Sequence, residues 1–226
     1  MYIKEPSEKA QAVIIWLHGL GSNAQDMASL SSVLTVKESV QHIHLQAPSI
    51  AVTINGGMIM PAWYDINLPG VNTREDLNGL IDSQSYLESI IEQQISAGFN
   101  SQQIFLAGFS QGGAVALFTG INYAKPLGGV ICLSGYLPCQ QYITTKQAIN
   151  MPIFCGIGSN DDVVLPKWTK AGLQFLVQQQ YNEVLVREYN MAHSVCPEEI
   201  KDVSKWIAEC IETNKIRHQM AGGVQL

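Results

Sequence analysis

Runs of apolar residues alternate with stretches of helical periodicity along the chain. The continuous apolar run Ala12-Val-Ile-Ile-Trp-Leu17 is typical of a strand that is buried on both faces of a parallel sheet. Between residues 74 and 97 the apolar residues recur every three or four positions, which predicts one long amphipathic helix that stops at Gly98. The same reasoning predicts strands at 43–46, 103–107, 129–133, 151–157 and 183–189, and helices at 26–36, 113–118, 166–179 and 197–213. This alternation predicts an α/β fold, in which a mostly parallel central sheet carries helices on both faces.

The length and composition favour one domain. With 226 residues, of which 46% are hydrophobic and 14% charged, the chain can bury a sizeable core, so we expect a single domain over 1–226 with its core at about 12–211. The helical pattern is lost after residue 213, and we expect 214–226 to be a mobile tail.

Charge and cysteine usage narrow the function classes. The net charge is −6 and no cluster of Lys and Arg exists to neutralise phosphates, which argues against a nucleic-acid partner. The first apolar run is too short for a signal peptide or a membrane span, so we expect a cytoplasmic protein. Five cysteines without a Cys-x-x-Cys pair predict buried free thiols rather than a disulfide frame or a zinc site.

The central motif is Gly108-Phe-Ser-Gln-Gly112, which lies between a predicted strand and a predicted helix. Strand, tight turn and helix in this order form a nucleophile elbow, whose glycines prevent clashes and whose serine hydroxyl is exposed. A serine needs a histidine base, and the base needs a carboxylate that holds it in the right tautomer. Ser110 is therefore a candidate nucleophile.

The base and the acid are expected later in the chain, in the order serine, acid, histidine. Asp161 and Asp162 follow the 151–157 strand, and His193 follows the 183–189 strand. Both loops leave the carboxyl ends of predicted strands, where open α/β sheets bind ligands. The residues alone do not separate Asp161 from Asp162, because one of two adjacent loop carboxylates is commonly only solvated.

Other histidines and glycines have simpler interpretations. The loop His18-Gly-Leu-Gly-Ser-Asn23 lacks the Gly-Lys-Ser/Thr ending of a phosphate-binding loop and is typical of a loop that supplies an oxyanion-hole N–H group. We expect His18 to shape this loop. His42 and His44 could form a metal pair, but no third ligand is near them in the sequence.

The segment 47–71 is too apolar for an ordinary surface loop. Asn55-Gly56-Gly57 predicts a hairpin, and Met58, Met60, Trp63 and Leu68 are candidate substrate-binding residues. Packing on the core is the equally weighted alternative. The insert 68–71 is a candidate lid over the site.

Several blocks together resemble one known family. They are His18-Gly-Leu-Gly21, the 47–65 stretch that ends in Trp-Tyr-Asp, Gly108-Phe-Ser-Gln-Gly-Gly-Ala114, Leu133-Ser-Gly-Tyr-Leu-Pro138, and the Asp and His loops. They are similar, from about residue 12 to 211, to the acyl-protein thioesterase and carboxylesterase family of α/β-hydrolases.

The resemblance implies residue roles: Ser110 as nucleophile, His193 as base, and the N–H groups of Leu20 and Gln111 as oxyanion hole. The family pattern Gly-x-x-Asp matches Gly158-Ser-Asn-Asp161 and implies Asp161 as the acid, although Ile157 stands where the family has histidine and Leu165 is an extra residue.

The resemblance further implies an α/β-hydrolase fold and hydrolysis of carboxylic esters and of thioesters on S-acylated (palmitoylated) proteins, without metal or other cofactor. The alternatives are a small-molecule carboxylesterase, a lysophospholipase, and a binding module without turnover. Expected partners are acyl substrates, a transient membrane surface and, as an open alternative, a second copy of the chain; no nucleic acid or integral membrane segment is expected.

Overall fold

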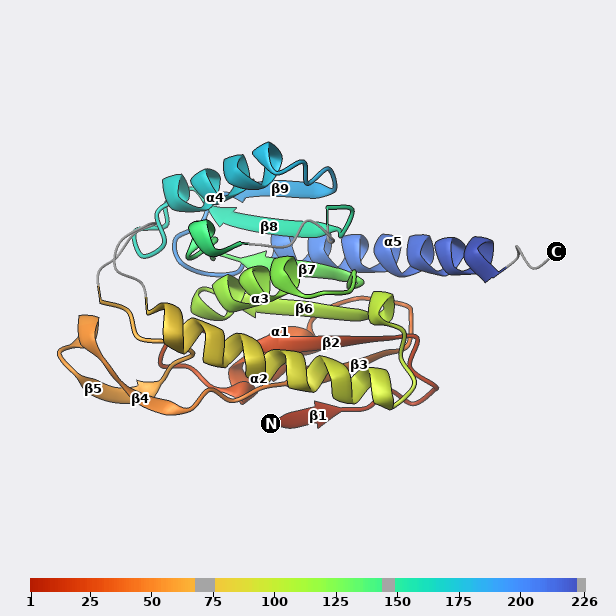
Figure 1. The fold of residues 1–226 in the computed structure, drawn as a ribbon, viewed down its shortest axis with the longest axis horizontal. Helices are drawn as coiled ribbons and strands as arrows, with labels where there is room; N and C mark the ends of the chain where they lie inside the picture. The colour runs from red at the N-terminus through yellow and green to blue at the C-terminus, as the bar shows by residue number, and fades with distance from the viewer. Residues whose placement is uncertain (68–75, 144–148, 223–226) are drawn as a thin grey trace.

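The computed structural model describes residues 1–67, 76–143 and 149–222. Within these ranges seven strands form the central sheet: β1 (Tyr2–Lys4), β2 (Ala12–Leu17), β3 (Val40–His44), β6 (Ile104–Phe109), β7 (Gly129–Leu133), β8 (Ile153–Gly158) and β9 (Val184–Tyr189). Their order in space is β1-β3-β2-β6-β7-β8-β9 (Figure 1). Only β1 runs antiparallel to its neighbour, so the carboxyl ends of the other six strands meet at one edge.

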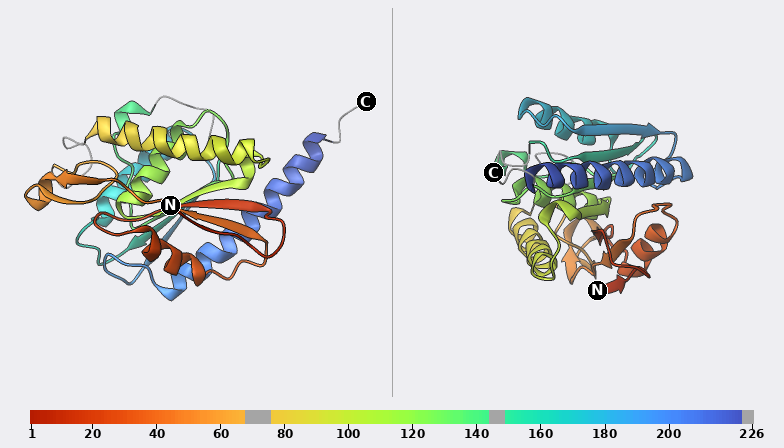
Figure 2. Two further views of the ribbon diagram at one scale, coloured as in Figure 1. Left: turned by 90° about the horizontal axis from the view of Figure 1, so that it is seen from below. Right: turned by 90° about the vertical axis from the view of Figure 1, so that its right-hand side faces the viewer.

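Helices cover both faces of the sheet. The helices are α1 (Ala24–Ser32), α2 (Leu77–Ser96), α3 (Gln111–Asn122), α4 (Pro166–Gln178) and α5 (Pro197–Gly222). On one face α2, α3 and α4 pack against the sheet, and on the other face α1 and α5 do so (Figure 2). Successive side chains of a strand point to opposite faces, so Ile15 packs under the first layer and Ile14 under the second. Burial on both sides explains why β2 is apolar throughout.

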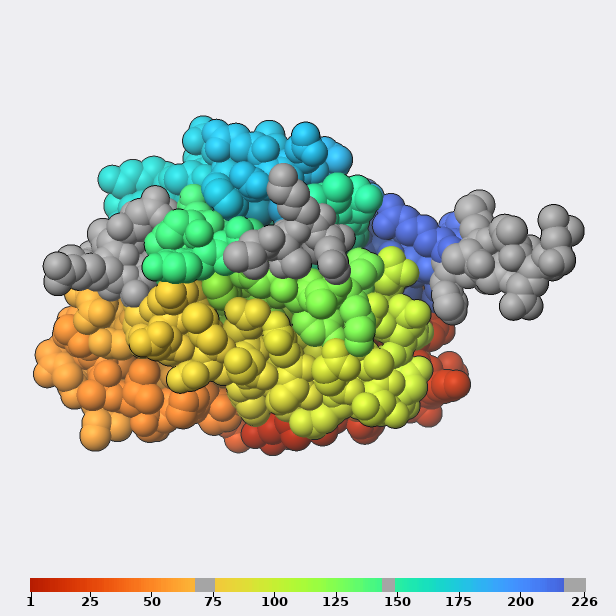
Figure 3. All heavy atoms as spheres, in the orientation of Figure 1, coloured from red at the N-terminus to blue at the C-terminus, as the bar shows by residue number. Residues whose placement is uncertain are grey.

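A small hairpin stands apart from these layers. It consists of β4 (Ser49–Val52) and β5 (Met58–Pro61), which pair antiparallel, with the short 3₁₀ turn Thr53–Asn55 between them. Gly56 and Gly57 have φ angles of 67° and 79°, which residues that carry a side chain rarely adopt. The hairpin predicted at this place is confirmed. Figures 1 and 3 show it (orange) at the end of the molecule opposite the last turns of α5.

The predicted α/β fold is confirmed, and the predictions for the two ends of the chain need correction. The first eleven residues contain β1, which the pattern does not reveal because all three of its side chains are exposed. The last helix does not end at Thr213 but continues to Gly222, so residues 214–222 are not an irregular tail. Asn214 is buried, and its amide donates to the carbonyls of Gln102 (3.0 Å) and Gly128 (3.3 Å), which ties this part of α5 to the body.

Candidate active site

Ser110 occupies a strained turn between β6 and α3. Its φ of 55° and ψ of −120° are unusual for a residue with a side chain. The turn is held by Ser110 N–H, which donates to the Leu133 carbonyl at 2.9 Å. A side chain at position 108 would collide with the backbone of Gly112, and one at position 112 with the carbonyl of Leu17. Both glycines of the motif are therefore required by close backbone approach.

His193 and Asp161 meet Ser110 at the carboxyl edge of the sheet. The His193 Nε2 atom lies 2.8 Å from Ser110 Oγ, and its Nδ1 atom lies 2.7 Å from Asp161 Oδ2. The carboxylate can only accept, so Nδ1 carries the proton and Nε2 is left to accept from the serine hydroxyl. This is the arrangement that turns a serine hydroxyl into a nucleophile.

Backbone donors orient the Asp161 carboxylate. Its second oxygen, Oδ1, accepts from the N–H groups of Val163 and Val164, each at 2.9 Å. Asp161 is 4% exposed, whereas the adjacent Asp162 is exposed to solvent. Of the two adjacent carboxylates, Asp161 is the one that contacts His193.

The His193 ring is fixed by its surroundings. Its side chain is 16% exposed, and the Phe109 ring lies beside it with centroids 4.8 Å apart. The following residue, Ser194, accepts a hydrogen bond at its carbonyl from Ser134 Oγ at 3.2 Å. The loop that carries the histidine is therefore tied to the loop after β7.

Leu20 and Gln111, the residues predicted to form the oxyanion hole, lie in the same region. Gln111 is the first residue of α3, so its N–H has no partner inside the helix. Leu20 lies in the loop after β2, where Gly19 packs against Ser110. Both residues line the cavity that opens beside the serine. Donors at such positions can hold an oxyanion that forms next to Ser110.

His18 stabilises the Leu20 loop. Its Nε2 accepts from Ala47 N–H at 3.1 Å, so its Nδ1 carries the proton and donates to the Gly19 carbonyl at 2.7 Å. Burial lowers the pKa of His18, partly offset by the Gly19 carbonyl and Asp26, and keeps the ring neutral. His18 thus shapes its loop, as predicted.

An apolar cavity of about 370 Å³ adjoins Ser110 and His193. Its apolar wall comes from the hairpin side through Ile54 and Ile66, and from the opposite side through Val163, Val164 and Trp168. Its volume lies within the range of about 300–1,000 Å³ that is usual for small-molecule sites. The sequence interpretation missed this wall. The adjacent apolar pair Val163-Val164, directly after the acidic pair in a loop, was the signal that could have identified it.

The structure does not bring the predicted substrate-binding residues into this cavity. Met58 is 63% exposed on the hairpin, and Met60 lies against Gly21. Trp63 is buried, with 3% of its surface exposed, and none of these three is among the described residues that line the cavity. Leu68 and the candidate lid at 68–71 lie outside the described residues.

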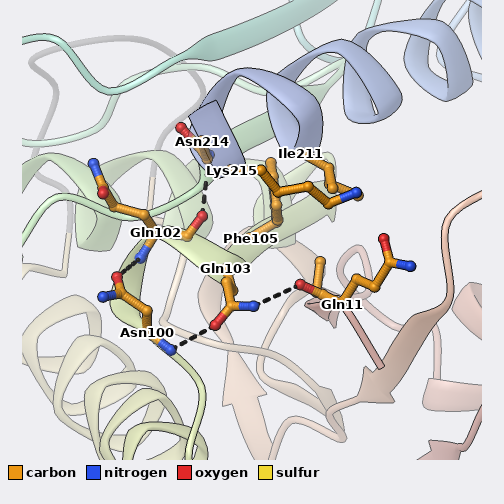
Figure 4. Close-up of a pocket in the computed structure, with 9 residues that line it drawn as sticks. Gln11, Asn100, Gln102, Gln103, Phe105, Ile211, Asn214 and Lys215 are labelled. Atoms are coloured by element: carbon orange, nitrogen blue, oxygen red, sulfur yellow. Dashed lines mark hydrogen bonds between the residues drawn. The ribbon is translucent and has the colours of Figure 1, made fainter. Parts of the chain in front are cut away.

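A second cavity, of about 200 Å³, lies at the opposite edge of the sheet between α5 and the start of β6 (Figure 4). Its polar groups bond to one another: Gln103 Nε2 donates to the Gln11 carbonyl and Asn100 N–H donates to Gln103 Oε1. The Asn214 amide holds α5 to Gln102. These amides cap and connect elements, so the cavity has a structural explanation.

His42 and His44 are also engaged in packing. His42 Nδ1 accepts from Trp16 Nε1 at 3.0 Å, and His44 Nε2 lies 2.8 Å from Ser31 Oγ. In residues 1–67, 76–143 and 149–222 no three His, Cys, Asp or Glu side chains gather as a metal site. The five cysteines, all within the described ranges, form no disulfide, and Cys196 is the most exposed of them.

The helices of the described ranges include none that is long and apolar enough to cross a membrane. The phospholipase/carboxylesterase family model matches residues 1–211. Acyl-protein thioesterase 1 of Yarrowia lipolytica is 35% identical over 93% of this chain and 97% of its own. Acyl-protein thioesterase 1 of Saccharomyces cerevisiae is 32% identical over 91% and 96%.

Solved structures of other proteins share this fold. The crystal structure of Zea mays acyl-protein thioesterase 2 superposes with a TM-score of 0.83 at 26% identity, over 93% of this chain and 98% of that one. Arabidopsis thaliana SOBER1 reaches 0.83 at 28% identity, over 88% and 99%. The fold is that of the α/β-hydrolases, as the resemblance implied, and the chain belongs to the phospholipase/carboxylesterase family of hydrolases.

Proposed function

We propose that this protein hydrolyses acyl thioesters and esters, including those of S-acylated proteins, with Ser110 as nucleophile, His193 as base and Asp161 as the acid that orients it. The observation that carries the proposal is the hydrogen-bonded series Ser110–His193–Asp161 beside an apolar cavity. Relatives that are named acyl-protein thioesterase over nearly the whole chain support the thioester.

The mechanism follows from the atoms. His193 Nε2 takes the hydroxyl proton as Ser110 Oγ bonds to the acyl carbon, and the N–H groups of Leu20 and Gln111 hold the resulting oxyanion. When the C–S or C–O bond breaks, His193 gives this proton to the leaving thiolate or alkoxide. A water molecule then attacks the acyl-serine and gives one proton to His193. The acid is released as Ser110 Oγ regains that proton.

The proposed acyl-binding site is the cavity between Ile54 and Ile66 on one side and Val163 and Trp168 on the other. Each CH₂ group that leaves water contributes about 0.8 kcal/mol, so a few carbons change affinity by orders of magnitude. This site favours acyl chains over acetate.

The hairpin supports a proposed transient contact with a membrane surface, where S-acylated proteins reside. Ile54, Met58 and Ile59 are 42%, 63% and 73% exposed, which is unusual for large apolar side chains gathered on one hairpin. Flotation with phosphatidylcholine vesicles tests this contact, and sedimentation of the free protein tests the alternative of a second copy. Free cysteines support a reducing compartment such as the cytoplasm.

The decisive experiment compares an S-octanoyl cysteine peptide with the p-nitrophenyl esters of acetate, butyrate and octanoate. Fluorophosphonate labelling of wild type, but not of Ser110→Ala, is expected beside turnover of both substrate classes. Turnover of esters alone would restrict the function to a small-molecule carboxylesterase, and labelling of neither variant would contradict a serine hydrolase. Release of fatty acid from lysophosphatidylcholine tests the lysophospholipase alternative.

A further inference from the structure

Trp63 lies behind the active site rather than in it. It follows β5 by two residues, and with 3% of its surface exposed it is enclosed between the hairpin and α2. Ser83 Oγ, from α2, donates to its backbone carbonyl. The three polar groups of this residue, which are the indole N–H, the backbone N–H and the carbonyl, all have partners, so its orientation is fixed.

One of these groups holds the loop that carries Leu20. The Trp63 indole Nε1 donates to the His18 carbonyl at 2.8 Å, and the two rings lie 5.3 Å apart. On the other side of Leu20, Gly21 N–H donates to the Pro61 carbonyl of β5 at 2.8 Å. The peptide that contains the Leu20 N–H is thus tied, before and after, to β5 and the residues that follow it.

Another group holds the elbow. The side-chain oxygen Oε1 of Gln111 accepts from the Trp63 N–H at 2.9 Å, and its Nε2 donates to the Tyr64 carbonyl at 2.8 Å. Gln111 is 2% exposed, so both bonds are shielded from water. Both ends of the Gln111 amide are therefore used to join the first turn of α3 to the residues after β5.

We infer that Trp63 is a positioning residue that holds the two donors of the oxyanion hole, the N–H groups of Leu20 and Gln111, in a fixed position relative to each other. The inference rests on the proposed function, in which the N–H groups of Leu20 and Gln111 are the two donors. These donors come from segments about ninety residues apart, and Trp63 bonds to both segments. Close packing of Gly112 on the Leu17 and His18 carbonyls, and of Gly19 on Ser110, also joins the segments, and Trp63 adds directional hydrogen bonds to both.

The glycines of the loop make the position of its backbone depend on hydrogen bonds, which include the two on either side of Leu20 and the bond from His18 Nδ1 to the Gly19 carbonyl. Leu20 is flanked by Gly19 and Gly21, and Gly21 has a φ of 73°. A peptide between two glycines rotates easily unless its neighbours are bonded. Loss of one oxyanion donor costs about 10²–10³ in kcat, and a displacement of about 1 Å at a reacting group costs about 10². We therefore expect loosening of the hole to lower kcat by about 10-fold to 100-fold.

The test is Trp63→Phe, which keeps an aromatic ring but removes the indole donor. The matched control is Trp206→Phe, since Trp206 is also buried but packs on Phe105 and Phe154 on the other face of the sheet. Both variants are assayed with the p-nitrophenyl esters of acetate, butyrate and octanoate and by thermal unfolding. They are also assayed with a butyl boronic acid, whose adduct on Ser110 places an oxygen in the oxyanion hole.

Trp63→Phe is expected to lower kcat at least 10-fold with KM within two-fold, and to weaken boronate binding by a similar factor. Trp206→Phe is expected to lower the melting temperature but to leave kcat and boronate affinity within two-fold. An unchanged kcat in Trp63→Phe overturns the inference. So does a rise of KM that grows with acyl length, which would make Trp63 a wall of the acyl site.

If Trp63→Phe does not fold, Gln111→Met tests the inference in the same assays. This variant keeps the side-chain volume and the backbone N–H of residue 111 but removes the side-chain amide. The same loss of kcat and boronate affinity supports the inference, and an unchanged kcat overturns it. A wild-type protein that neither turns over substrate nor reacts with fluorophosphonate contradicts the proposed function itself. An active wild type with an unaffected Trp63→Phe contradicts only the role of Trp63.

Discussion

The two sides of the site are built in different ways. On the proposed catalytic side, which comprises Ser110, His193 and Asp161, each side-chain polar group has a hydrogen-bond partner at 2.7–2.9 Å. The acyl side consists of the hairpin and the apolar wall of the cavity, where Ile54 and Val163 are 42% and 55% exposed. Hydrogen bonds fix the orientation of the side chains on the catalytic side, whereas the acyl side presents apolar surface whose contacts are not directional.

This difference predicts how each side responds to substitution. Directional groups act on the transition state, so changes on the catalytic side should lower kcat. Apolar contacts act on ground state and transition state alike, so changes on the acyl side should raise KM in proportion to the length of the acyl chain.

Loss of the nucleophile should have the largest effect. Ser110→Ala removes one hydroxyl from a turn that is held by its backbone, so we expect kcat to fall by about 10⁴-fold or more with the melting temperature nearly unchanged. Steady-state kinetics and fluorophosphonate labelling measure the loss. Comparable turnover in this variant would contradict the mechanism.

The two adjacent carboxylates allow a matched comparison on the same side. Asp161→Asn removes the acceptor that fixes the His193 tautomer and should lower kcat by about 10⁴-fold, whereas Asp162→Asn, at an exposed position, should change it less than two-fold. The opposite ranking would assign the role to Asp162.

The two sides also differ in how far the sequence could predict them. Residue types and chain order were enough to nominate Ser110 and His193, because the topology brings the carboxyl ends of parallel strands to one edge. The choice of Asp161 needed coordinates or a family pattern, since two neighbouring carboxylates look alike in sequence. On the acyl side, the residues that face the cavity depend on how the hairpin is oriented, and no local pattern encodes that. The sequence therefore did not distinguish Met58 from Ile54 as a cavity-lining residue, although of these two only Ile54 lines the cavity.

The helices and strands likewise divide into those that the sequence predicts well and those that it does not. Strands that are buried on both faces, such as β2 and β7, were predicted within one residue because their apolar runs are continuous. β1 was missed because its side chains are exposed, and α5 was shortened because the buried residue that continues it is the polar Asn214. Polar residues that are buried for a specific hydrogen bond are invisible to hydrophobic periodicity.

A smaller effect is expected on the acyl side. Ile54→Asp and Val163→Asp place a charge on the cavity wall and should raise KM for octanoate esters about 10-fold, while acetate esters change less than two-fold. Both residues are partly exposed, so the melting temperature should change little. Ile59→Asp is the control, because Ile59 is 73% exposed and is not among the described residues that line the cavity. Equal effects on all esters would show that the wall does not bind the acyl chain.

Glu199, in the first turn of α5, lies outside both sides of the site and is a buried carboxyl group without such hydrogen bonds within the described ranges. It is fully buried, and neither carboxylate oxygen has a hydrogen-bond partner among the residues described. Burial raises its pKa to about 8, and the Cys196 backbone opposes this rise while the charge of Asp202 adds to it. Glu199 is thus mostly protonated at neutral pH.

The smallest effect, on stability alone, is predicted at this residue. Between pH 4.5 and about 8 the unfolded chain releases the Glu199 proton while the folded protein keeps it, so this stabilisation is complete below pH 4.5 and is lost as pH rises to about 8. The glutamine of Glu199→Gln cannot ionise, so the melting temperature of this variant should rise relative to that of wild type by several degrees from pH 5 to pH 8 and then level off. For a protein of this size, each kcal/mol of stability corresponds to about 2–4 °C in melting temperature. The exposed neighbour supplies the control, since Glu198→Gln should show no such trend. Melting curves of the three proteins at matched pH values measure this difference, with kcat at pH 7 expected within two-fold of wild type. A Glu199→Gln difference that is independent of pH would mean that the Glu199 carboxyl is already ionised in the folded protein.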